Sequence, residues 1–353
     1  MKKTDFLVVG SGLAGSVLAL EMLRAGCTVR VLTDSSLPSS SRVAGGLINP
    51  VTGKYLAKTW LADTLFSTLE TYYKELENRL SASFYHPTGL FRPFTGEEHR
   101  RSSQAQIIKH ALEDYVEIRP ADEAVSAGFN SGPEGMYSPA AGWMDMPVFL
   151  DAAARYLQGE AEWADTAFDF EEFSIQADGV KFRDWEASRV VFCEGFYARN
   201  NPYFRWLPFN PVKGETLTGV IEDYGVSTIV NQGKWIIPLG DNRVRLGATY
   251  SWHELDFEPT ARAREELLAV AGKMLRKPFR VTGQQAGVRP ATKDRRPFVG
   301  RHPGQPLLYI FNGLGAKGVS LAPHFAKQLV QNILHDELIH PEANIERFYT
   351  LYS

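Results

Sequence analysis

The stretch that most restricts the fold lies near the start of the chain, at residues 6–34, and reads FLVVGSGLAGSVLALEMLRAGCTVRVLTD. The apolar run at 6–9 is typical of a strand that is buried on both faces. Residues 16–24 contain neither Pro nor Gly and favour a helix, which Gly26 ends. A second apolar run follows at 29–32. This order predicts a strand, a glycine turn, a helix and a second strand, which together form a βαβ unit.

Glycines stand in the turn between the first strand and the helix with the spacing G-x-G-x-x-G, at Gly10, Gly12 and Gly15. In dinucleotide-binding units such glycines allow a tight turn, backbone approach to a pyrophosphate, and close packing of the helix on the strand. The phosphates then lie at the positive end of the helix. Asp34 is placed to bind a ribose hydroxyl, although the acid of such units often falls where Thr33 stands. The motif predicts dinucleotide binding, and its spacing does not distinguish NAD from FAD.

Composition and charge exclude several classes of function. The 353 residues are 44% apolar and 22% charged, which is ordinary for a globular protein of two domains or one elaborated domain. The net charge of −3 attracts neither nucleic acid nor an anionic membrane, and the basic run at 289–301 is typical of a solvated face. The two cysteines, Cys27 and Cys193, exclude a disulfide scaffold and a cysteine-based zinc site.

The sequence also lacks the signals of several other classes. The apolar run near the N-terminus is too short for a signal peptide or a membrane span, so we expect a cytoplasmic protein without a membrane partner. There is no H-E-x-x-H spacing, no G-x-S-x-G and no P-loop, so no metal site is expected.

The rest of the chain predicts further helices and strands. Helices are expected over residues 57–80, 97–114, 147–158 and 259–277, with a last one ending near 335. Strands are expected within 161–193, and antiparallel strands within 211–250. We therefore expect a discontinuous nucleotide-binding domain, formed by 1–79, 143–210 and 282–353. A second domain, formed by 80–142 and 211–281, would be inserted between its pieces.

Three separated motifs resemble the D-amino acid oxidase family of flavoenzymes. The run at 34–50, DSSLPSSSRVAGGLINP, resembles the segment in which an acid binds the FAD ribose and a glycine turn passes close to the flavin. Residues 287–300, GVRPATKDRRPFVG, are similar to the segment that glycine oxidases place over the flavin. Residues 311–318, FNGLGAKG, resemble the matching loop of sarcosine oxidases. The motifs occur in the required order and leave residues 80–142 largely unmatched.

This resemblance implies an α/β fold, with a Rossmann-like FAD-binding domain of the glutathione-reductase type and an inserted α+β substrate domain built on an antiparallel sheet. It also implies non-covalent FAD, because Gly287 stands where sarcosine oxidases carry the cysteine that links the flavin. Carried over position by position, it implies cofactor contacts at Gly10, Ser11, Gly12, Leu13, Ala14, Gly15, Thr33, Asp34, Arg42, Ala44, Gly45, Gly46, Phe168, Gly195, Gly313, Leu314, Gly315, Ala316, Lys317 and Gly318. Backbone N–H groups of the last loop would stabilise negative charge on the reduced flavin.

The resemblance further implies roles for four side chains near the substrate. Arg289 aligns with the arginine that binds the substrate carboxylate through two parallel hydrogen bonds. Lys317 stands where sarcosine oxidases have a lysine that contacts this carboxylate, the alternative being a solvated side chain. Arg245 replaces a lysine linked to oxygen activation, and an arginine keeps its charge, which argues against fast reaction with O2. Trp235 replaces a tyrosine and is either an apolar wall of the pocket or part of the core.

The implied reaction is oxidation of the C–N bond of a small amine or amino acid by hydride transfer to flavin N5, giving an imine. The electrons would then pass to O2 or another acceptor. An alternative is oxidation of a modified wobble-uridine side chain in tRNA, because GLGAKG followed by LAP also resembles that branch. The net charge of −3 argues against it, since phosphate contacts supply most of the affinity for nucleic acid. A third alternative is a flavoprotein without turnover.

Overall fold

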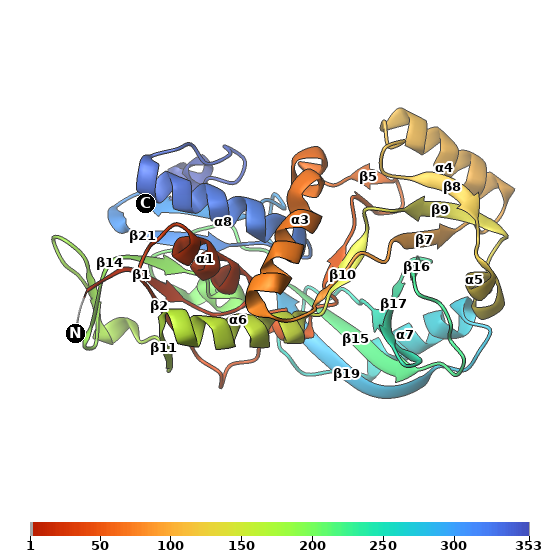
Figure 1. The fold of residues 1–353 in the computed structure, drawn as a ribbon, viewed down its shortest axis with the longest axis horizontal. Helices are drawn as coiled ribbons and strands as arrows, with labels where there is room; N and C mark the ends of the chain where they lie inside the picture. Colours follow the sequence, from red (N-terminus) through yellow and green to blue (C-terminus); the bar gives the residue numbers. More distant parts are fainter. Residues whose placement is uncertain (1–2, 353) are drawn as a thin grey trace.

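Two eight-stranded sheets organise the part of the chain that the computed structural model describes, residues 3–352 (Figure 1). Helices α1, α6 and α8 lie in the half with the first sheet, α4, α5 and α7 lie in the half with the second, and α3 runs between them. The helices are α1 (Leu13–Arg24), α2 (Ser40–Val43), α3 (Ala62–Leu80), α4 (Glu97–Lys109), α5 (Glu123–Gly128), α6 (Met146–Glu160), α7 (Ala261–Met274) and α8 (Gly318–His335). Three 3-10 turns complete them, η1 (Phe170–Glu172), η2 (Gly195–Asn200) and η3 (Ile345–Leu351).

The first sheet contains the predicted βαβ unit. Its strands follow the order β11-β2-β1-β14-β13-β12, with β21 beside β14 and β20 beside β21. They are β1 (Thr4–Val9), β2 (Val29–Thr33), β11 (Glu162–Asp165), β12 (Phe173–Ile175), β13 (Val180–Phe182), β14 (Trp185–Phe192), β20 (Phe298–His302) and β21 (Gln305–Asn312). Strand β1 pairs in parallel with β2 and with β14, which confirms the βαβ unit. The carboxyl ends of these parallel strands meet at one edge, where open α/β sheets bind their ligands.

The apolar run in β1 is buried on both faces, as its sequence predicts. Val8 lies in register with Val31 on one side and with Val191 on the other, and all three are fully buried. On one face of the sheet, residues of α1, α3, α6 and α8 complete the core. On the other face an aromatic cluster packs, which includes Phe182 and Phe192. The sheet edge that carries the glycine turn is therefore held by packing from both sides.

The second sheet follows the order β19-β15-β18-β17-β16-β7-β9-β8 and is antiparallel except between β16 and β7. Its strands are β7 (Leu90–Pro93), β8 (Glu117–Pro120), β9 (Glu134–Ser138), β15 (Val212–Val220), β16 (Ile229–Asn231), β17 (Trp235–Gly240), β18 (Arg243–Gly247) and β19 (Arg280–Arg289). One face packs against α7 through Leu217, Leu246 and Leu267. Residues that alternate with these, among them Thr216 and Trp235, line a cavity. The alternation of the strands therefore separates core side chains from cavity side chains.

Two expected helices differ from the structure by five residues at one end. The helix expected from residue 57 begins at Ala62, because β5 (Ala57–Lys58) pairs with β4 (Val51–Thr52) and the N–H of Thr59 donates to Pro50. The helix expected to reach residue 114 ends at Lys109. A small sheet of β3 (Leu47–Ile48), β10 (Gly142–Met144) and β6 (Tyr85–His86) completes the strands.

The expected division into domains remains a prediction. Strands of the first sheet come from 4–33, 162–192 and 298–312, which lie within the ranges expected for the nucleotide-binding domain. Strand β19, however, crosses the expected boundary between 281 and 282, because it pairs with β15 along its length up to Arg289. Arg289 therefore belongs to the second sheet, although the motif that contains it, residues 287–300, continues into β20 of the first sheet.

Candidate cofactor and substrate site

The glycine turn after β1 has no room for side chains. Gly10 has a φ of 101°, and a Cβ at this position would lie 2.6 Å from the carbonyl oxygen of Cys193. A Cβ at Gly15 would lie 1.7 Å from the carbonyl oxygen of Gly10. Gly12 is the N-cap of α1 and brings no side chain of its own, while the N–H of Leu13 donates to Ser41 Oγ at 3.1 Å. The N-terminus of α1 therefore opens onto the cavity that Gly12 and Leu13 line, as an anion-binding helix end requires.

A cavity of about 1220 Å³ extends from this turn to the face of the second sheet. The expected cofactor residues on its wall are Gly10, Ser11, Gly12, Leu13, Ala14, Thr33, Asp34, Arg42, Ala44, Gly45, Gly46, Phe168, Gly195, Leu314, Gly315, Ala316 and Gly318. Of the residues expected near the substrate, Trp235 and Arg289 also line it. The two sheets thus bring residues from both ends of the sequence to one cavity, whose glycine cradle and volume fit a dinucleotide.

Four expected site residues lie off this wall, Gly15, Gly313, Lys317 and Arg245. Gly15 instead contacts the backbone of Gly10, which is the packing role of the third glycine. Gly313 has a φ of 74°, and a Cβ there would lie 2.6 Å from Thr292 Cγ2. These two glycines therefore set the conformation of segments whose neighbouring residues line the cavity.

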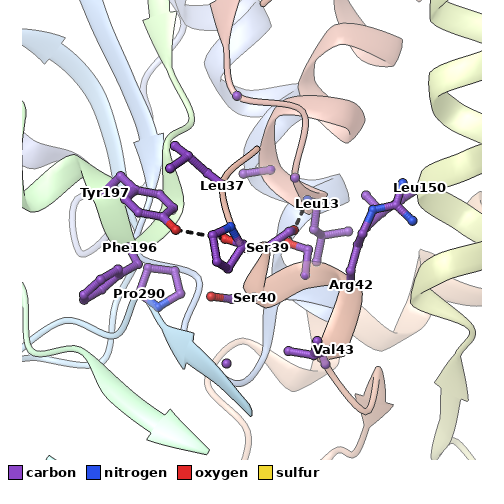
Figure 2. A pocket seen from close by; sticks show the side chains of 18 of the residues that line it. Leu13, Leu37, Ser39, Ser40, Arg42, Val43, Leu150, Phe196, Tyr197 and Pro290 are labelled. Atoms are coloured by element: carbon purple, nitrogen blue, oxygen red, sulfur yellow. Dashed lines mark hydrogen bonds between the residues drawn. The ribbon is translucent and has the colours of Figure 1, made fainter. Parts of the chain in front are cut away.

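The segment after β2 closes one side of the cavity (Figure 2). The hydroxyl of Tyr197 donates to the carbonyl of Pro38 at 3.1 Å, and Ser40 Oγ donates to the carbonyl of Val288 at 2.6 Å. These contacts tie the segment to η2 and to β19. Asp34 Oδ1 accepts from the backbone N–H of Ser36 at 3.0 Å, so this carboxylate also holds the turn in which it stands.

Arg289 places a buried positive charge on the wall. Its guanidinium lies 4.5 Å from the ring centre of Tyr250, and Nη1 is 3.5 Å from the carbonyl oxygen of Thr249. A Cβ at Gly214 would lie 2.1 Å from Nη2, so only glycine admits the guanidinium at this place. Burial lowers the pKa of Arg289 from its ordinary value. No Asp or Glu within residues 3–352 forms an ion pair with it, which leaves the guanidinium free for a carboxylate from the cavity.

Trp235 lies where the two halves meet. A Cβ at Gly45 or at Gly247 would lie 2.6 Å from Cη2 of its indole, so the ring is held between two glycines. The ring both lines the cavity and packs on buried neighbours, which combines the two interpretations that the sequence left open. Behind it, Arg245 Nη1 donates to the carbonyl of Ala44 at 3.1 Å. Arg245 thus supports the turn at Ala44–Gly46 from outside the cavity wall, and burial lowers its pKa.

Lys317 is the N-cap of α8 and is not among the residues that line the cavity. Its Nζ donates to Thr59 Oγ1 at 3.2 Å. Burial lowers the pKa of Lys317, and the positive charges of Arg296 and Arg295 lower it further. The side chain is half-buried, so the alternative of a solvated lysine does not describe it.

Sequence reasoning missed Glu194, a carboxyl group on the cavity wall directly before Gly195. Burial raises the pKa of Glu194 to about 7, although a hydrogen bond from Asn201 Nδ2 to Oε2, at 2.7 Å, acts in the opposite direction. Its place at the carboxyl end of β14, beside β1, was the signal that could have found it, because ligands bind at that edge of the sheet.

Residues 3–352 hold neither a cluster of metal-ligating side chains nor a membrane-spanning helix. In this range no group of three or more His, Cys, Asp or Glu side chains could hold a metal ion. None of the helices described is both long enough and apolar enough to cross a membrane.

Comparison with known proteins identifies a matching family and two kinds of related protein. The family model described as FAD dependent oxidoreductase, DAO, matches residues 5–332. A glycine oxidase of Pseudomonas putida is 34% identical over 338 residues, which cover 90% of this chain and 91% of that protein. The tRNA 5-methylaminomethyl-2-thiouridine biosynthesis bifunctional protein MnmC of Idiomarina loihiensis is 23% identical over 347 residues. That match covers 92% of this chain but 55% of the relative, so the chain spans about half the length of such bifunctional proteins.

A solved structure shares the fold. The glycine oxidase of Bacillus cereus superposes with a TM-score of 0.81, covering 95% of this chain and 96% of that chain, at 20% identity. This likeness extends over both sheets, which is why it defines the architecture of the whole chain.

Proposed function

Because the chain belongs to the DAO family of FAD-dependent oxidoreductases, we propose that it oxidises the C–N bond of a small amine or amino acid to an imine. The family match confirms the resemblance of the three motifs and the α/β fold class with an FAD-binding domain. FAD is the cofactor, held without a covalent bond, and when bound it supplies N5 as the hydride acceptor. The residues of this chain bind and orient the substrate and shape the surroundings of the ring.

The observation that carries this proposal is the buried guanidinium of Arg289, which lines the cavity and has no acidic counter-ion among residues 3–352. A buried charge without a partner is costly, and a substrate carboxylate would neutralise it through two parallel hydrogen bonds. The ring of Tyr250 beside the guanidinium restricts its position. The substrate would therefore be held in one orientation, which is what transfer of a hydride from a defined carbon requires.

Besides an oriented substrate, the reaction requires a place that stabilises negative charge on the reduced flavin. The loop before α8 supports this requirement. Leu314, Gly315 and Ala316 line the cavity at the N-terminus of α8, where the helix dipole is positive. Backbone N–H groups at such a helix end stabilise an anionic ring. Trp235 and Gly45 add an apolar section to the wall of the same cavity.

The test is anaerobic titration of the FAD-loaded protein, followed by the flavin absorbance. The panel contains D- and L-amino acids and N-alkyl glycines, each paired with the corresponding amine that lacks the carboxylate. We expect one carboxylated amine to bleach the flavin while its decarboxylated partner does not. Admitting air then shows whether O2 is the acceptor. Bleaching by the paired amines to the same extent would contradict the role of the carboxylate.

A second candidate function is oxidation of a modified uridine side chain in tRNA. One structural observation favours it. Tyr250 and Trp252 are 57% and 54% exposed and stack at 6.3 Å, with Tyr250 on the cavity wall, and exposed aromatic rings of this kind stack with bases. Relatives named for tRNA thiouridine biosynthesis match most of the chain. The net charge of −3 argues against it. Bleaching of the flavin by modified tRNA alone would establish this function, and bleaching by no compound would support a flavoprotein without turnover.

A further inference from the structure

Glu194 lies against the turn at which the phosphates of the cofactor bind. It follows β14, which pairs with β1, and its backbone N is 3.4 Å from the position that a Cβ at Gly10 would occupy. Both residues line the cavity. The next residue, Gly195, has a φ of 57°, and its carbonyl accepts from Asn312 Nδ2 at 3.0 Å. The position of Glu194 beside the glycine turn is therefore held from β21 as well as from β14.

The groups around Glu194 offer it no positive charge. Asn201, which is 1% exposed, donates to Oε2 and is held in turn because its Oδ1 accepts from the N–H of Tyr203 at 2.9 Å. Within residues 3–352 no Lys, Arg or His forms an ion pair with Glu194. Arg199, on η2, faces the ring of Phe196 at 4.7 Å.

The titratable groups nearby are neutral or negative. Cys193 is fully buried, and burial raises the pKa of its thiol well above the ordinary value. Burial also raises the pKa of Tyr197 on η2, and the negative charge of Asp34 adds to this effect. Asn312 on β21 and the glycine turn on β1 carry no charge. Among the side chains that the structure describes, an ionised Glu194 would thus have only the amide of Asn201 as a hydrogen-bond donor.

The pyrophosphate of FAD brings negative charge to the same turn. Two like charges in a water-poor site disfavour the ionised form of the group that can be protonated. We propose that Glu194 binds FAD as a neutral carboxylic acid, and that binding FAD therefore takes up a proton. The neutral carboxyl group can donate its O–H to a cofactor oxygen, which a carboxylate cannot do.

This role has a defined pH dependence. Below the pKa of Glu194 in the cofactor-free protein, about 7, the carboxyl group is protonated before and after binding, so the Kd for FAD does not change with pH. Above it, the free protein loses the proton that the complex keeps, so the Kd rises by a factor of about ten per pH unit. The inference rests on FAD as the cofactor and does not depend on which amine is oxidised.

The experiment measures the Kd of the cofactor-free protein for FAD from about pH 6 to about pH 9, from the quenching of flavin fluorescence. We expect the Kd of the wild type to rise above neutrality and that of Glu194→Gln to stay constant, because the amide is a neutral isostere. Glu258→Gln is the matched control, since Glu258 lines the same cavity but is exposed, and it should follow the wild type. Equal slopes for the wild type and Glu194→Gln would overturn the proposal.

Calorimetry of the wild type provides a second readout that needs no variant. Titration with FAD at about pH 8, in buffers of different ionisation enthalpy, should show uptake of about one proton per FAD. Binding without proton uptake would equally overturn the proposal. Neither measurement involves turnover, so a failure of amine oxidation and a failure of this inference remain distinguishable.

Discussion

Arg289 and Glu194 line the same cavity from different sheets, and within residues 3–352 neither of them has an ion-pair partner. A protein that only packed these side chains would gain by neutralising them, because an unpaired buried charge is destabilising. In our proposals each group is left to a ligand, a substrate carboxylate at Arg289 and the cofactor at Glu194. Lys317 differs from both, since it contacts Thr59, does not line the cavity, and has a pKa that burial and the charges of Arg296 and Arg295 lower.

Arg289→Lys should weaken the binding of the substrate more than it changes the binding of the cofactor. The lysine keeps the charge but loses the planar pair of donors, so we expect a roughly 10- to 100-fold rise in the Kd for the carboxylated amine, as when a charged hydrogen bond is lost. Anaerobic titration of the flavin absorbance measures this. Arg301→Lys, an exposed position in the same basic run, should leave the Kd unchanged. An unchanged Kd in Arg289→Lys would exclude the proposed contact.

Glu194→Gln should also change how the stability of the cofactor-free protein depends on pH. Burial raises the pKa of Glu194 from 4.5 to about 7, so the folded state binds more protons than the unfolded state between these values. The contribution to stability is therefore fully present below pH 4.5 and is lost as the pH rises through about 7. Chemical denaturation across this pH range should show that the free energy of unfolding of the wild type falls as the pH rises. This fall should be absent from Glu194→Gln. If the two curves run parallel, the carboxyl group is not held neutral by burial.

At the scale of elements, the glycine turn and α1 form one unit whose spacing depends on the absence of side chains. Gly15 brings the first turn of α1 against the carbonyl of Gly10, and this contact sets how closely the helix approaches β1. The same approach brings the N-terminus of α1 to the cavity. The packing of the helix and the phosphate binding that we propose therefore rest on the same residue spacing.

Gly15→Ala should separate the close contact between α1 and the carbonyl of Gly10 from the general effect of glycine on helix stability. The added Cβ would meet the carbonyl oxygen of Gly10, so α1 must shift, and we expect a loss of about 1–3 kcal/mol in unfolding free energy together with weaker FAD binding. The matched control is Gly159→Ala in α6, where a Cβ meets nothing within 4 Å. It should stabilise the protein by up to about 1 kcal/mol and leave FAD binding unchanged. Equal effects of the two changes would show that the close contact is not essential.

At the scale of the whole molecule, the cavity wall is shared between the two sheets. Gly10 and Gly12 lie in the turn that follows β1 of the first sheet, and Trp235 and Arg289 lie in strands of the second. A cofactor bound there contacts elements that are far apart in the sequence, and its binding energy therefore stabilises the arrangement of both halves.

FAD should accordingly raise the stability of the entire chain. At a free concentration of about 100 times its Kd, FAD should add about 2.7 kcal/mol to the free energy of unfolding. Hydrogen exchange should show slower exchange in the second sheet at 284–289 as well as in the first at 6–9. If protection were confined to residues of the first sheet, the second would not contribute to the cofactor site.

The sequence by itself determined the βαβ unit, the glycine turn and the family, because each motif that defines them consists of residues that are neighbours along the chain. Backbone conformation at Gly10 and the start of α1 follow from local spacing, which any reader of the sequence can count. The DAO match over residues 5–332 agrees with the motifs quoted from both ends.

Only the tertiary structure decided the surroundings of each charge. Arg289 has no ion-pair partner among the described residues because Gly214 and Thr249, far away in sequence, surround its guanidinium. Lys317 faces Thr59, and Glu194 lies beside Gly10, through packing of segments that share no local pattern. The pKa of a side chain, and whether its charge has a partner, depend on burial and on neighbours that are distant in sequence. A sequence motif records neither.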